Sequence, residues 1–403
     1  MIYEDIESIA SEIESEIIKI RRHLHSNPEL SFKEYNTSKY IFDKLIEYGL
    51  ENVKIVADTG VVALIEGGSK EDNHKTVLLR GDIDALPIKE ETGLEFASCN
   101  DYMHACGHDA HTAWTIGSAV VLNRIRKDLK GDVKVVFQMA EEVGGASKII
   151  DSGILENPPV NIALAGHCWP SLECGVVGIA KGVAMASTGG FTINIKGKGG
   201  HGAEPHNCID PIAIGTDIYN SIQKIVSRRV DIKDPVVISV CSFHSGNYQN
   251  IIPDTCTIEG TVRALSHNRL HEINSIIKDI VESTSRIYSG ESTVKFSMGL
   301  HPVINDVELI KLSLDSLEKH LPEGRVKLIE HPAMTGEDFS EFSRRIPGLF
   351  LYIGSASDNS GRNHKLHSSK FDIDESAIKN AIVIFTRIIF DYLSEYIDRN
   401  NEK

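Results

Sequence analysis

The sequence lacks any apolar run near the ~20 residues that a membrane-spanning helix needs. Basic residues are also in deficit, since 42 Lys and Arg stand against 57 Asp and Glu and give a net charge of -15. This surplus of negative charge argues against nucleic acid or an anionic membrane as a partner. The composition therefore favours chemistry on a small molecule.

Several signatures of catalysis and targeting are missing as well. No G-x-S-x-G elbow occurs, which disfavours a serine hydrolase. The glycine-rich stretch 197–202 lacks the G-x-x-x-x-G-K-[ST] order of a phosphate loop, so nucleotide binding is discounted. The first twenty residues lack the basic start and apolar core of a signal peptide, and their isoleucines recur at helical spacing among glutamates. We expect an amphipathic helix there.

The cysteines do not form a recognisable disulfide framework. There are seven of them, an odd number, scattered along the chain. This pattern is typical of reduced thiols in a cytoplasmic protein, and we expect most of them to be packing residues.

The order of periodic segments predicts two domains, because 403 residues exceed what one core usually fills. Strands are predicted around 77–80, 133–139, 162–166 and 349–353, and helices around 37–48, 114–127, 146–155, 307–320, 337–345 and from 375. Between them lie strands at 191–195, 236–243, 255–264 and 292–298 and helices at 210–228 and 268–288. This βαββαβ order is typical of a ferredoxin-like sandwich. We expect a discontinuous α/β domain at 1–186 and 299–403, with an insertion at 187–298.

The densest chemistry lies in Met103–Thr112, which holds three histidines, a cysteine and an aspartate in ten residues. Thiolate and imidazole suit zinc and related divalent ions, and Gly107 would let the backbone turn so that Cys106 and His108 face one point. The alternative is a helix with the histidines on one face and Cys106 as a buried small residue. An apolar helix follows directly, so the cluster lies at a helix entry, which favours the metal site.

Further candidate ligands lie near other predicted strands. Glu141 and Glu142 follow the strand at 133–139, and adjacent side chains on an extended chain point in opposite directions. One could then hold a metal while the other moves protons, although a solvated acidic turn is the alternative. His167 ends the strand at 162–166, and His367 lies in a polar loop after the last strand.

Three more polar residues stay open on sequence alone. Asp84 follows the strand at 77–80, where it could orient a ligating histidine or merely cap a loop. His23 and His25 precede Pro28 near the end of the first helix, where basic side chains are favourable to the helix dipole.

The insertion carries its own polar candidates. His201 stands among glycines, which suggests an accessible imidazole. Asn250 and Arg263 are thirteen positions apart, a spacing that suits flanking a hairpin, and together they could grip a carboxylate. A turn asparagine and a surface arginine are the alternative reading of that pair.

Nine motifs together carry a resemblance to a known family. They are RRHLHSNPELSFKE, LLRGDIDALP, MHACGHDAHT, QMAEEVGGA, AGHCWP, GKGGHGAEPH, QNIIPDT, TGEDF and LHSSKF. From about Arg21 to Glu375 the chain resembles the bacterial and plant amidohydrolases of the aminoacylase/carboxypeptidase metallopeptidase family, such as hippurate hydrolases. The resemblance implies a zinc-peptidase-like catalytic domain, with a mixed sheet flanked by helices, and an inserted lid or dimerisation domain.

The resemblance also implies roles for particular residues. Two divalent ions, Zn²⁺ or Mn²⁺, would be held by Cys106, His108, Glu142, His167 and His367. Glu141 would be the general base, His201 would polarise the substrate carbonyl, and Asn250 and Arg263 would hold its carboxylate. Asp82 stands where related branches have a ligating histidine, and it is not assigned as a ligand.

The reaction implied is hydrolysis of the amide bond in an N-acyl amino acid or short peptide. A dipeptidase, a carboxypeptidase or an N-acetyl-diaminopimelate deacetylase would use the same centre on other substrates. A binding protein that kept the fold and lost catalysis is the alternative from another class, which the intact Glu141 argues against. Relatives further suggest a homodimer in which a partner subunit supplies His201.

Overall fold

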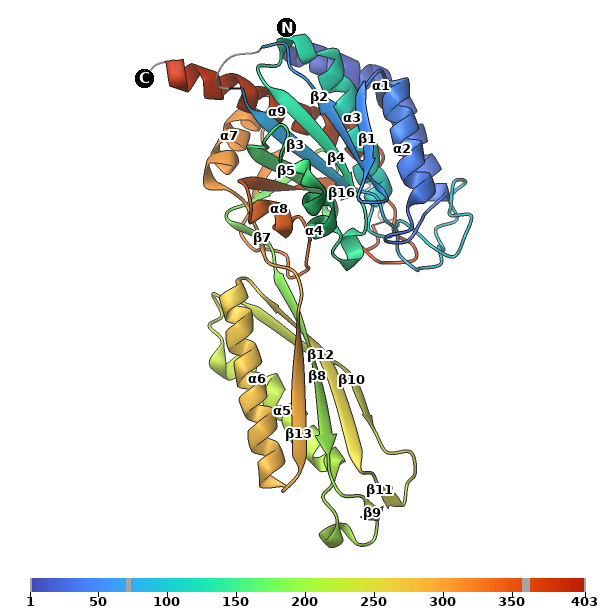
Figure 1. Ribbon diagram of the computed structural model, residues 1–403, viewed down its shortest axis with the longest axis vertical. Coiled ribbons are helices and arrows are strands. Elements are labelled where there is room, and N and C mark those ends of the chain that lie inside the picture. The colour runs from blue at the N-terminus through green and yellow to red at the C-terminus, as the bar shows by residue number, and fades with distance from the viewer. Residues whose placement is uncertain (1, 70–73, 357–362, 402–403) are drawn as a thin grey trace. The chain divides into compact units, whose positions relative to one another are not determined.

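The computed structural model describes residues 2–69, 74–356 and 363–401. Its chain divides into two compact units (Figure 1). The larger comprises residues 1–184, 304–331 and 338–403, and the smaller comprises 185–303 and 332–337. The breaks therefore lie at 184/185 and 303/304, whereas we expected 186/187 and 298/299. No sequence pattern indicated that 332–337 groups with the insertion.

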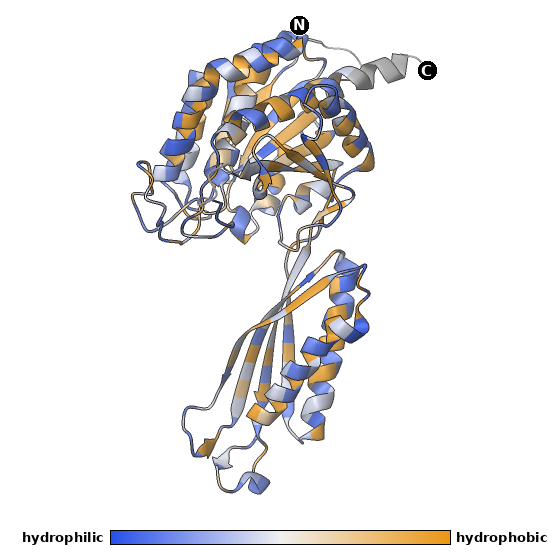
Figure 2. Ribbon diagram, turned by 180° about the vertical axis from the view of Figure 1, so that it is seen from behind, coloured by the Kyte–Doolittle hydropathy of each residue, from blue (hydrophilic) through white to orange (hydrophobic). Residues whose placement is uncertain are grey.

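The larger unit is built on a mixed eight-stranded sheet with the order β1-β2-β4-β3-β5-β16-β6-β15. Its strands are β1 (Asn52–Val56), β2 (Gly60–Ile65), β3 (Thr76–Asp82), β4 (Asp132–Gln138), β5 (Ile162–Glu173), β6 (Val177–Ala180), β15 (Val326–Ile329) and β16 (Gly348–Ala356). The central strands β4, β3, β5 and β16 run parallel to one another. Their side chains are almost all buried on both faces, as expected of parallel strands covered by helices. Figure 2 shows these strands as largely hydrophobic.

The helices of this unit cover the sheet. They are α1 (Ile2–Ser26), α2 (Tyr35–Glu47), α3 (His108–Arg124), α4 (Ala146–Ile149), α7 (Val307–Glu318), α8 (Ser340–Ser343) and α9 (Ser376–Asn401). α1, α3 and α9 pack against one another, with α3 against β3 and α9 against β16. Nearly every residue of α3 is buried, because it lies between the sheet and two other helices. Among the helices that the structure describes, none has the length and apolar character for crossing a membrane.

The smaller unit is a two-layer sandwich. Its elements are β8 (Ser187–Lys196), α5 (Pro211–Arg229), β10 (Val236–Ser245), β12 (Thr255–Ala264), α6 (His267–Ile287) and β13 (Glu291–Met298), with short strands β9 (Gly200–His201) and β11 (Ile251–Ile252). The main sheet is antiparallel with the order β10-β12-β8-β13, which is the ferredoxin-like arrangement predicted from the βαββαβ pattern. Burial alternates along β8, and its buried side chains join those of α5 and α6 in one core.

Three predicted elements differ from those observed. The strand expected to end on His167 continues through it to Glu173, because its pairing with β16 extends past that residue. The predicted helix at 337–345 is reduced to the four residues of α8. The helix predicted at 146–155 is α-helical only to Ile149, and Gly153 then takes a left-handed φ of 88°.

Candidate metal centre

The five predicted ligands come from four segments of the larger unit. Cys106 and His108 lie at the entry to α3, Glu142 follows β4, His167 lies within β5, and His367 lies in the loop before α9. The strands β4 and β5 approach this place with their carboxyl ends, as is usual for sites in α/β folds.

The turn into α3 depends on Gly107. Its φ is +87°, a left-handed conformation that favours glycine. A Cβ at this position would lie 2.3 Å from the sulfur of Cys168, so a side chain does not fit. Cys106 and His108 on either side are both buried. Glycine therefore turns the backbone at the point where the sequence predicted it.

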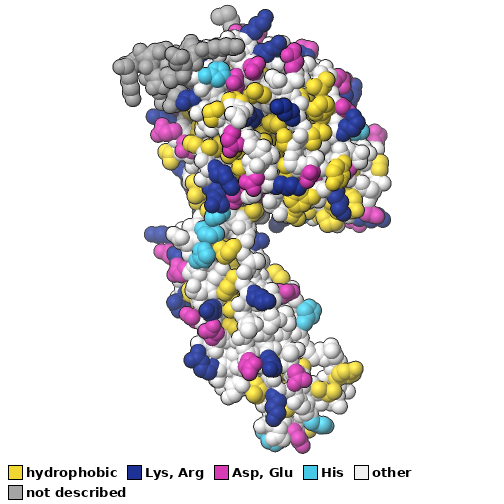
Figure 3. All heavy atoms as spheres, viewed as in Figure 1, with side chains coloured by type: hydrophobic (Ala, Val, Ile, Leu, Met, Phe, Trp, Pro, Cys, Tyr) yellow, Lys and Arg dark blue, Asp and Glu magenta, His cyan; other side chains and the backbone are white. Residues whose placement is uncertain are grey.

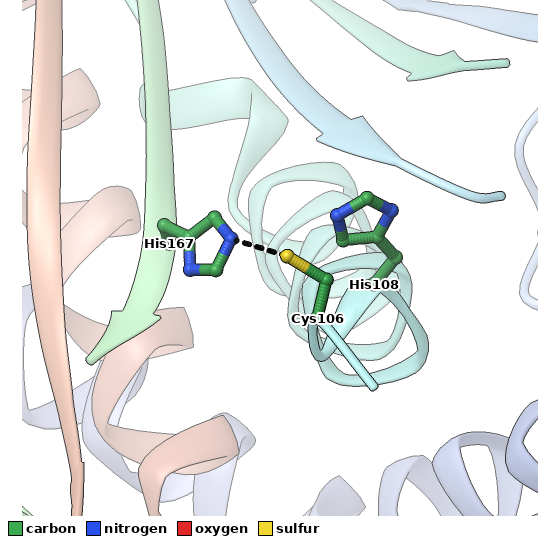
Figure 4. Close-up of side chains that lie close together, drawn as sticks. All are labelled: Cys106, His108 and His167. Atoms are coloured by element: carbon green, nitrogen blue, oxygen red, sulfur yellow. Dashed lines mark hydrogen bonds between the residues drawn. The ribbon is translucent and has the colours of Figure 1, made fainter. Parts of the chain in front are cut away.

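The structure brings the five predicted ligands together. Cys106 Sγ lies 3.3 Å from His167 Nε2 and 3.3 Å from His367 Nε2. His367 Nε2 lies 3.4 Å from Glu142 Oε1, which is 4.0 Å from His108 Nε2. Figure 4 shows Cys106 between His108 and His167. These side chains thus form one compact cluster of nitrogen, oxygen and sulfur donors.

Two of the histidines are oriented through the ring nitrogen that faces away from the cluster. His108 Nδ1 donates to Asp84 Oδ1 at 3.1 Å, and His167 Nδ1 donates to the carbonyl oxygen of Cys168 at 2.7 Å. Because Nδ1 carries the proton in each bond, Nε2 is left with a lone pair in the neutral ring. Metal-binding histidines are commonly held in this way. Asp84, whose role the sequence left open, therefore orients a histidine.

The donor set fits a divalent metal ion. His108 Nε2 and Glu142 Oε1 are buried, and neither has a hydrogen-bond partner among the described residues. Leaving two such atoms unsatisfied is costly unless something else binds them. Cys106 belongs to two overlapping groups of potential ligands, one with His108 and His167 and the other with Glu142 and His367.

The electrostatics of the site also favour a bound cation. Burial, together with the carboxylates of Glu142 and Glu141, raises the pKa of the Cys106 thiol well above its usual range. Burial would lower the pKa of His108, but the carboxylates of Asp82 and Asp84 outweigh it and raise that pKa to about 10. A bound dication would supply the positive charge that a thiolate and a neutral imidazole need here.

Glu141 and Glu142 do not lie on an extended strand, as the sequence suggested, but in the 3₁₀ turn Glu141–Val143. Ala140 has a φ of 58° and turns the chain after β4. The backbone N–H groups of both glutamates donate to Asp84, at 3.1 and 3.2 Å. The backbone N–H of Asp338 donates to Glu141 Oε1 at 3.3 Å. One aspartate thus fixes the turn, and a second segment holds the Glu141 carboxylate.

A buried ion network adjoins the cluster, and we predicted no role for its residues from the sequence. Arg80 bonds to Asp82 at 2.6 Å and to Asp338 at 2.8 Å, with all three side chains fully buried. Asp82 in turn accepts from His111 Nδ1 at 2.6 Å. Asp338 belongs to the TGEDF motif, so the motif was visible but its function was not. In the sequence, the pairing of Arg80 with Asp82 at the end of β3 was the feature that could have indicated this network.

A second buried network ties α1 to the same region. Arg21 bonds to Asp109 at 2.7 Å, and His25 Nδ1 lies 2.8 Å from the same Asp109 oxygen. Arg21 also bonds to Asp372 at 2.9 Å, in the segment between His367 and α9. His25 therefore does more than favour the dipole of α1, because its ring joins a network that holds the start of α3.

Two of the polar candidates in the insertion, His201 and Asn250, lie together in the smaller unit. His201 in β9 pairs with Ile251 in β11, and the N–H of Gly202 donates to the carbonyl oxygen of Asn250 at 2.9 Å. His201 is exposed, and its Nδ1 accepts the N–H of Ala203 at 3.1 Å. That bond leaves the proton of the neutral ring on Nε2, where it can be donated outward.

Arg263 lies elsewhere, and the hairpin interpretation is wrong on this point. It pairs with Thr188 near one end of β12, whereas Asn250 precedes Thr255 at the other end. Eight strand residues span roughly 27 Å. Arg263 is half-buried, and its guanidinium donates to the carbonyl oxygen of Val262 at 3.0 Å. Asn250 and Arg263 of one chain therefore do not meet at a single carboxylate.

The chain is similar to known proteins over most of its length. Residues 78–391 match the family described as Peptidase family M20/M25/M40. A thermostable carboxypeptidase of Saccharolobus solfataricus is 38% identical over 93% of this chain and 95% of its own length. An N-acyl-L-amino acid amidohydrolase of Geobacillus stearothermophilus is 39% identical over 76% of this chain and 82% of its own length. A solved Bacillus subtilis structure, described as a dinuclear metal binding peptidase from the M20 family, is 33% identical with a TM-score of 0.81 over 95% of this chain and 99% of that one.

Proposed function

Because the chain belongs to the peptidase family M20/M25/M40, and so to the hydrolases of amide bonds, we propose that it cleaves N-acyl amino acids to a carboxylic acid and a free amino acid. The observation that carries the proposal is a pair of buried atoms without a hydrogen-bond partner, His108 Nε2 and Glu142 Oε1, beside Cys106, His167 and His367. Both atoms can offer a lone pair to a metal ion. Similar proteins named for N-acyl amino acids and for N-acetylcysteine support this choice of substrate.

Two divalent ions, Zn²⁺ or Mn²⁺, would be held by Cys106, His108, Glu142, His167 and His367. Thiolate favours zinc, while carboxylate and imidazole also admit manganese. When bound, the ions would acidify a water molecule and polarise the scissile carbonyl. The two overlapping ligand groups that share Cys106 support two ions rather than one.

Glu141 would act as the general base. Its carboxylate accepts the N–H of Asp338, and the backbone of its turn is fixed by Asp84, so its position is defined before substrate arrives. Glu141 would take a proton from the attacking water as the C–O bond forms. It would then return that proton to the nitrogen as the C–N bond breaks.

The smaller unit would supply the remaining groups. His201 would donate from Nε2 to the oxyanion. Asn250 and Arg263 would hold the substrate carboxylate, and these two residues would come from different copies of the chain. That division follows from their places at opposite ends of β12. A homodimer, with lid and dimerisation roles for residues 187–298, and a cytoplasmic location are part of this proposal.

Mixing two inactive variants tests whether His201 acts across a dimer. His201→Ala and Glu141→Gln proteins, refolded together, should regain activity only if one mixed site receives an intact His201 from the partner and an intact Glu141 from its own chain. Recovery should reach up to about half of the sites in a mixed dimer. No recovery, with mixed dimers demonstrated by differently tagged chains, would place His201 and Glu141 of the same chain in one site.

A substrate panel tests the class of reaction. N-acetyl, N-benzoyl and dipeptide substrates should be compared on metal-reconstituted protein. Preference for N-acyl amino acids over dipeptides supports the proposal, whereas the reverse favours a dipeptidase or carboxypeptidase. Selective cleavage of N-acetyl-diaminopimelate would identify the deacetylase alternative. Metal-loaded protein that binds these compounds without turnover would instead indicate a binding protein.

A further inference from the structure

Three histidines lie together in the smaller unit, outside the candidate metal centre. The rings of His267 and His271 have centroids 4.8 Å apart and are nearly perpendicular, at 81°. The rings of His267 and His301 have centroids 4.2 Å apart and are stacked at 21°. His271 is exposed and the other two are partly exposed. Figure 3 shows histidine side chains grouped on the visible surface of this unit.

The local structure holds the three rings in place. His267 is the first residue of α6, after Ser266, whose hydroxyl accepts the N–H of Arg269 at 3.1 Å and caps the helix. His267 and His271 are four residues apart, so they lie on the same face of α6, one turn from each other. This spacing is the one by which helical histidine pairs bind zinc.

His301 is brought to that face by the chain that leaves β13. The N–H of Gly299 donates to the carbonyl oxygen of Thr188 at 2.9 Å, and the N–H of Leu300 donates to the Thr188 hydroxyl at 2.8 Å. The N–H of Thr188 donates back to the carbonyl oxygen of Leu300 at 2.9 Å. Three hydrogen bonds therefore fix the backbone just before His301.

The charge of the neighbouring Arg269 does not oppose a cation at this place. Arg269, the basic residue between the two helical histidines, bonds to Asp234 and to Glu272, each at 2.6 Å. Its positive charge is thus compensated. Nitrogens that share a tetrahedral ion at about 2.0–2.1 Å lie roughly 3.3 Å apart. The three rings are close enough to share an ion, but the stacked rings of His267 and His301 must turn out of their parallel arrangement before their nitrogens converge on it.

We propose that His267, His271 and His301 bind a divalent transition-metal ion, separate from the centre formed by Cys106 and its neighbours. Three imidazoles without carboxylates or thiolates select zinc, nickel or copper over magnesium, calcium or manganese. Three ligands leave a further coordination position for water or another donor. Because His301 lies near the end of this unit in the sequence, bound metal would also tie the departing chain to α6.

Counting bound metal in the holoenzyme tests the proposal. Protein whose candidate centre has been filled should be equilibrated with Ni²⁺ in a weak competing chelator and freed of unbound ion before elemental analysis. Wild type is expected to hold one nickel more per chain than His271→Ala or His301→Ala. Loss of a ligand should weaken this binding by at least the roughly 10- to 100-fold that follows loss of an outer partner.

His244→Ala is the matched control, because His244 is exposed in the same unit and lies on β10 away from α6 in sequence. It should bind nickel like wild type. The Cys106→Ala protein should also keep the extra ion, which separates this site from the proposed catalytic centre. Equal nickel content in wild type and in a folded His271→Ala protein would show that the rings merely pack, and the proposal would be wrong. Circular dichroism checks the fold of each variant.

Discussion

Replacing Asp84 with asparagine tests how the candidate metal centre is held. Asp84 Oδ1 accepts from His108 Nδ1 and from the N–H of Glu141, both at 3.1 Å. Its Oδ2 accepts from the Ser31 hydroxyl at 2.7 Å and from the N–H of Glu142 at 3.2 Å. All four groups are donors. Asparagine has the same shape but only one acceptor oxygen, so its NH₂ group must face one of these two pairs of donors.

The size of the effect follows from those contacts. Each hydrogen bond to a charged group contributes about 1.5–3 kcal/mol, and the amide would forfeit two of them in either orientation. Loss of a partner that orients a metal-binding histidine typically lowers metal affinity about 10- to 100-fold. That range corresponds to about 1.4–2.7 kcal/mol of binding free energy. We expect Asp84→Asn to raise the metal dissociation constant by this factor and to lower turnover with it.

Competition with a chromophoric chelator measures the dissociation constant of each variant. Ser31→Ala is the control, because it removes one donor to the same carboxylate and leaves His108 and the glutamates bonded to it. It should bind metal within a few-fold of wild type. The reasoning is refuted if folded Asp84→Asn binds metal as tightly as wild type, or if Ser31→Ala loses as much affinity.

Three other outcomes are expected. Glu141→Gln should keep its metal and lose nearly all turnover, because an amide cannot accept the proton of water; hydrolysis near the wild-type rate with full metal content would remove Glu141 as the base. Arg21→Met should lower the free energy of unfolding by about 3–5 kcal/mol, since Asp109 stays buried with only His25 left to bond to it, whereas the exposed neighbour Arg22→Met should cost under about 1 kcal/mol; similar denaturant midpoints for both would contradict this. Burial lowers the pKa of His25, but Asp109 outweighs burial and raises that pKa, so the stabilising contribution of His25 is present below about pH 6.5 and is lost as pH rises through its folded-state pKa. The difference in free energy of unfolding between wild type and His25→Gln should therefore shrink as pH rises over this range. A difference that grows instead would show that the pKa of His25 is not raised by folding.

Much of the fold could be predicted because hydrophobic periodicity reports it directly. The alternation of β8 and the helical spacing in α5 and α6 define the βαββαβ order, and the structure confirms it. The family was predicted from short motifs and is confirmed by the match over residues 78–391. Local patterns are sufficient for both, because neither depends on knowing which distant segments meet.

Contacts between distant segments were harder to predict. Nothing in the sequence near Glu141 shows that Asp84, 57 residues earlier, binds its backbone, or that Asp338, 197 residues later, holds its side chain. The turn at Ala140 was equally hidden, because a left-handed alanine is rare and its sequence resembles the end of an ordinary strand. The separation of Asn250 from Arg263 follows from the length of β12 rather than from their spacing in the chain.

Asp82 lies 3.9 Å from His108 Nδ1 but is not a proposed ligand, because its buried carboxylate is already bound by other side chains. One of its oxygens accepts from Arg80 and the other from His111, each at 2.6 Å, so both are engaged inside the protein. His111 is engaged too, since its Nε2 accepts the N–H of Cys168 at 3.0 Å. Moving Asp82 toward a metal would leave the Arg80 guanidinium with one fewer counter-charge in a fully buried place, at a cost of several kcal/mol. The strand end therefore supplies an ion pair, and Cys106 rather than Asp82 is the proposed metal donor beside His108.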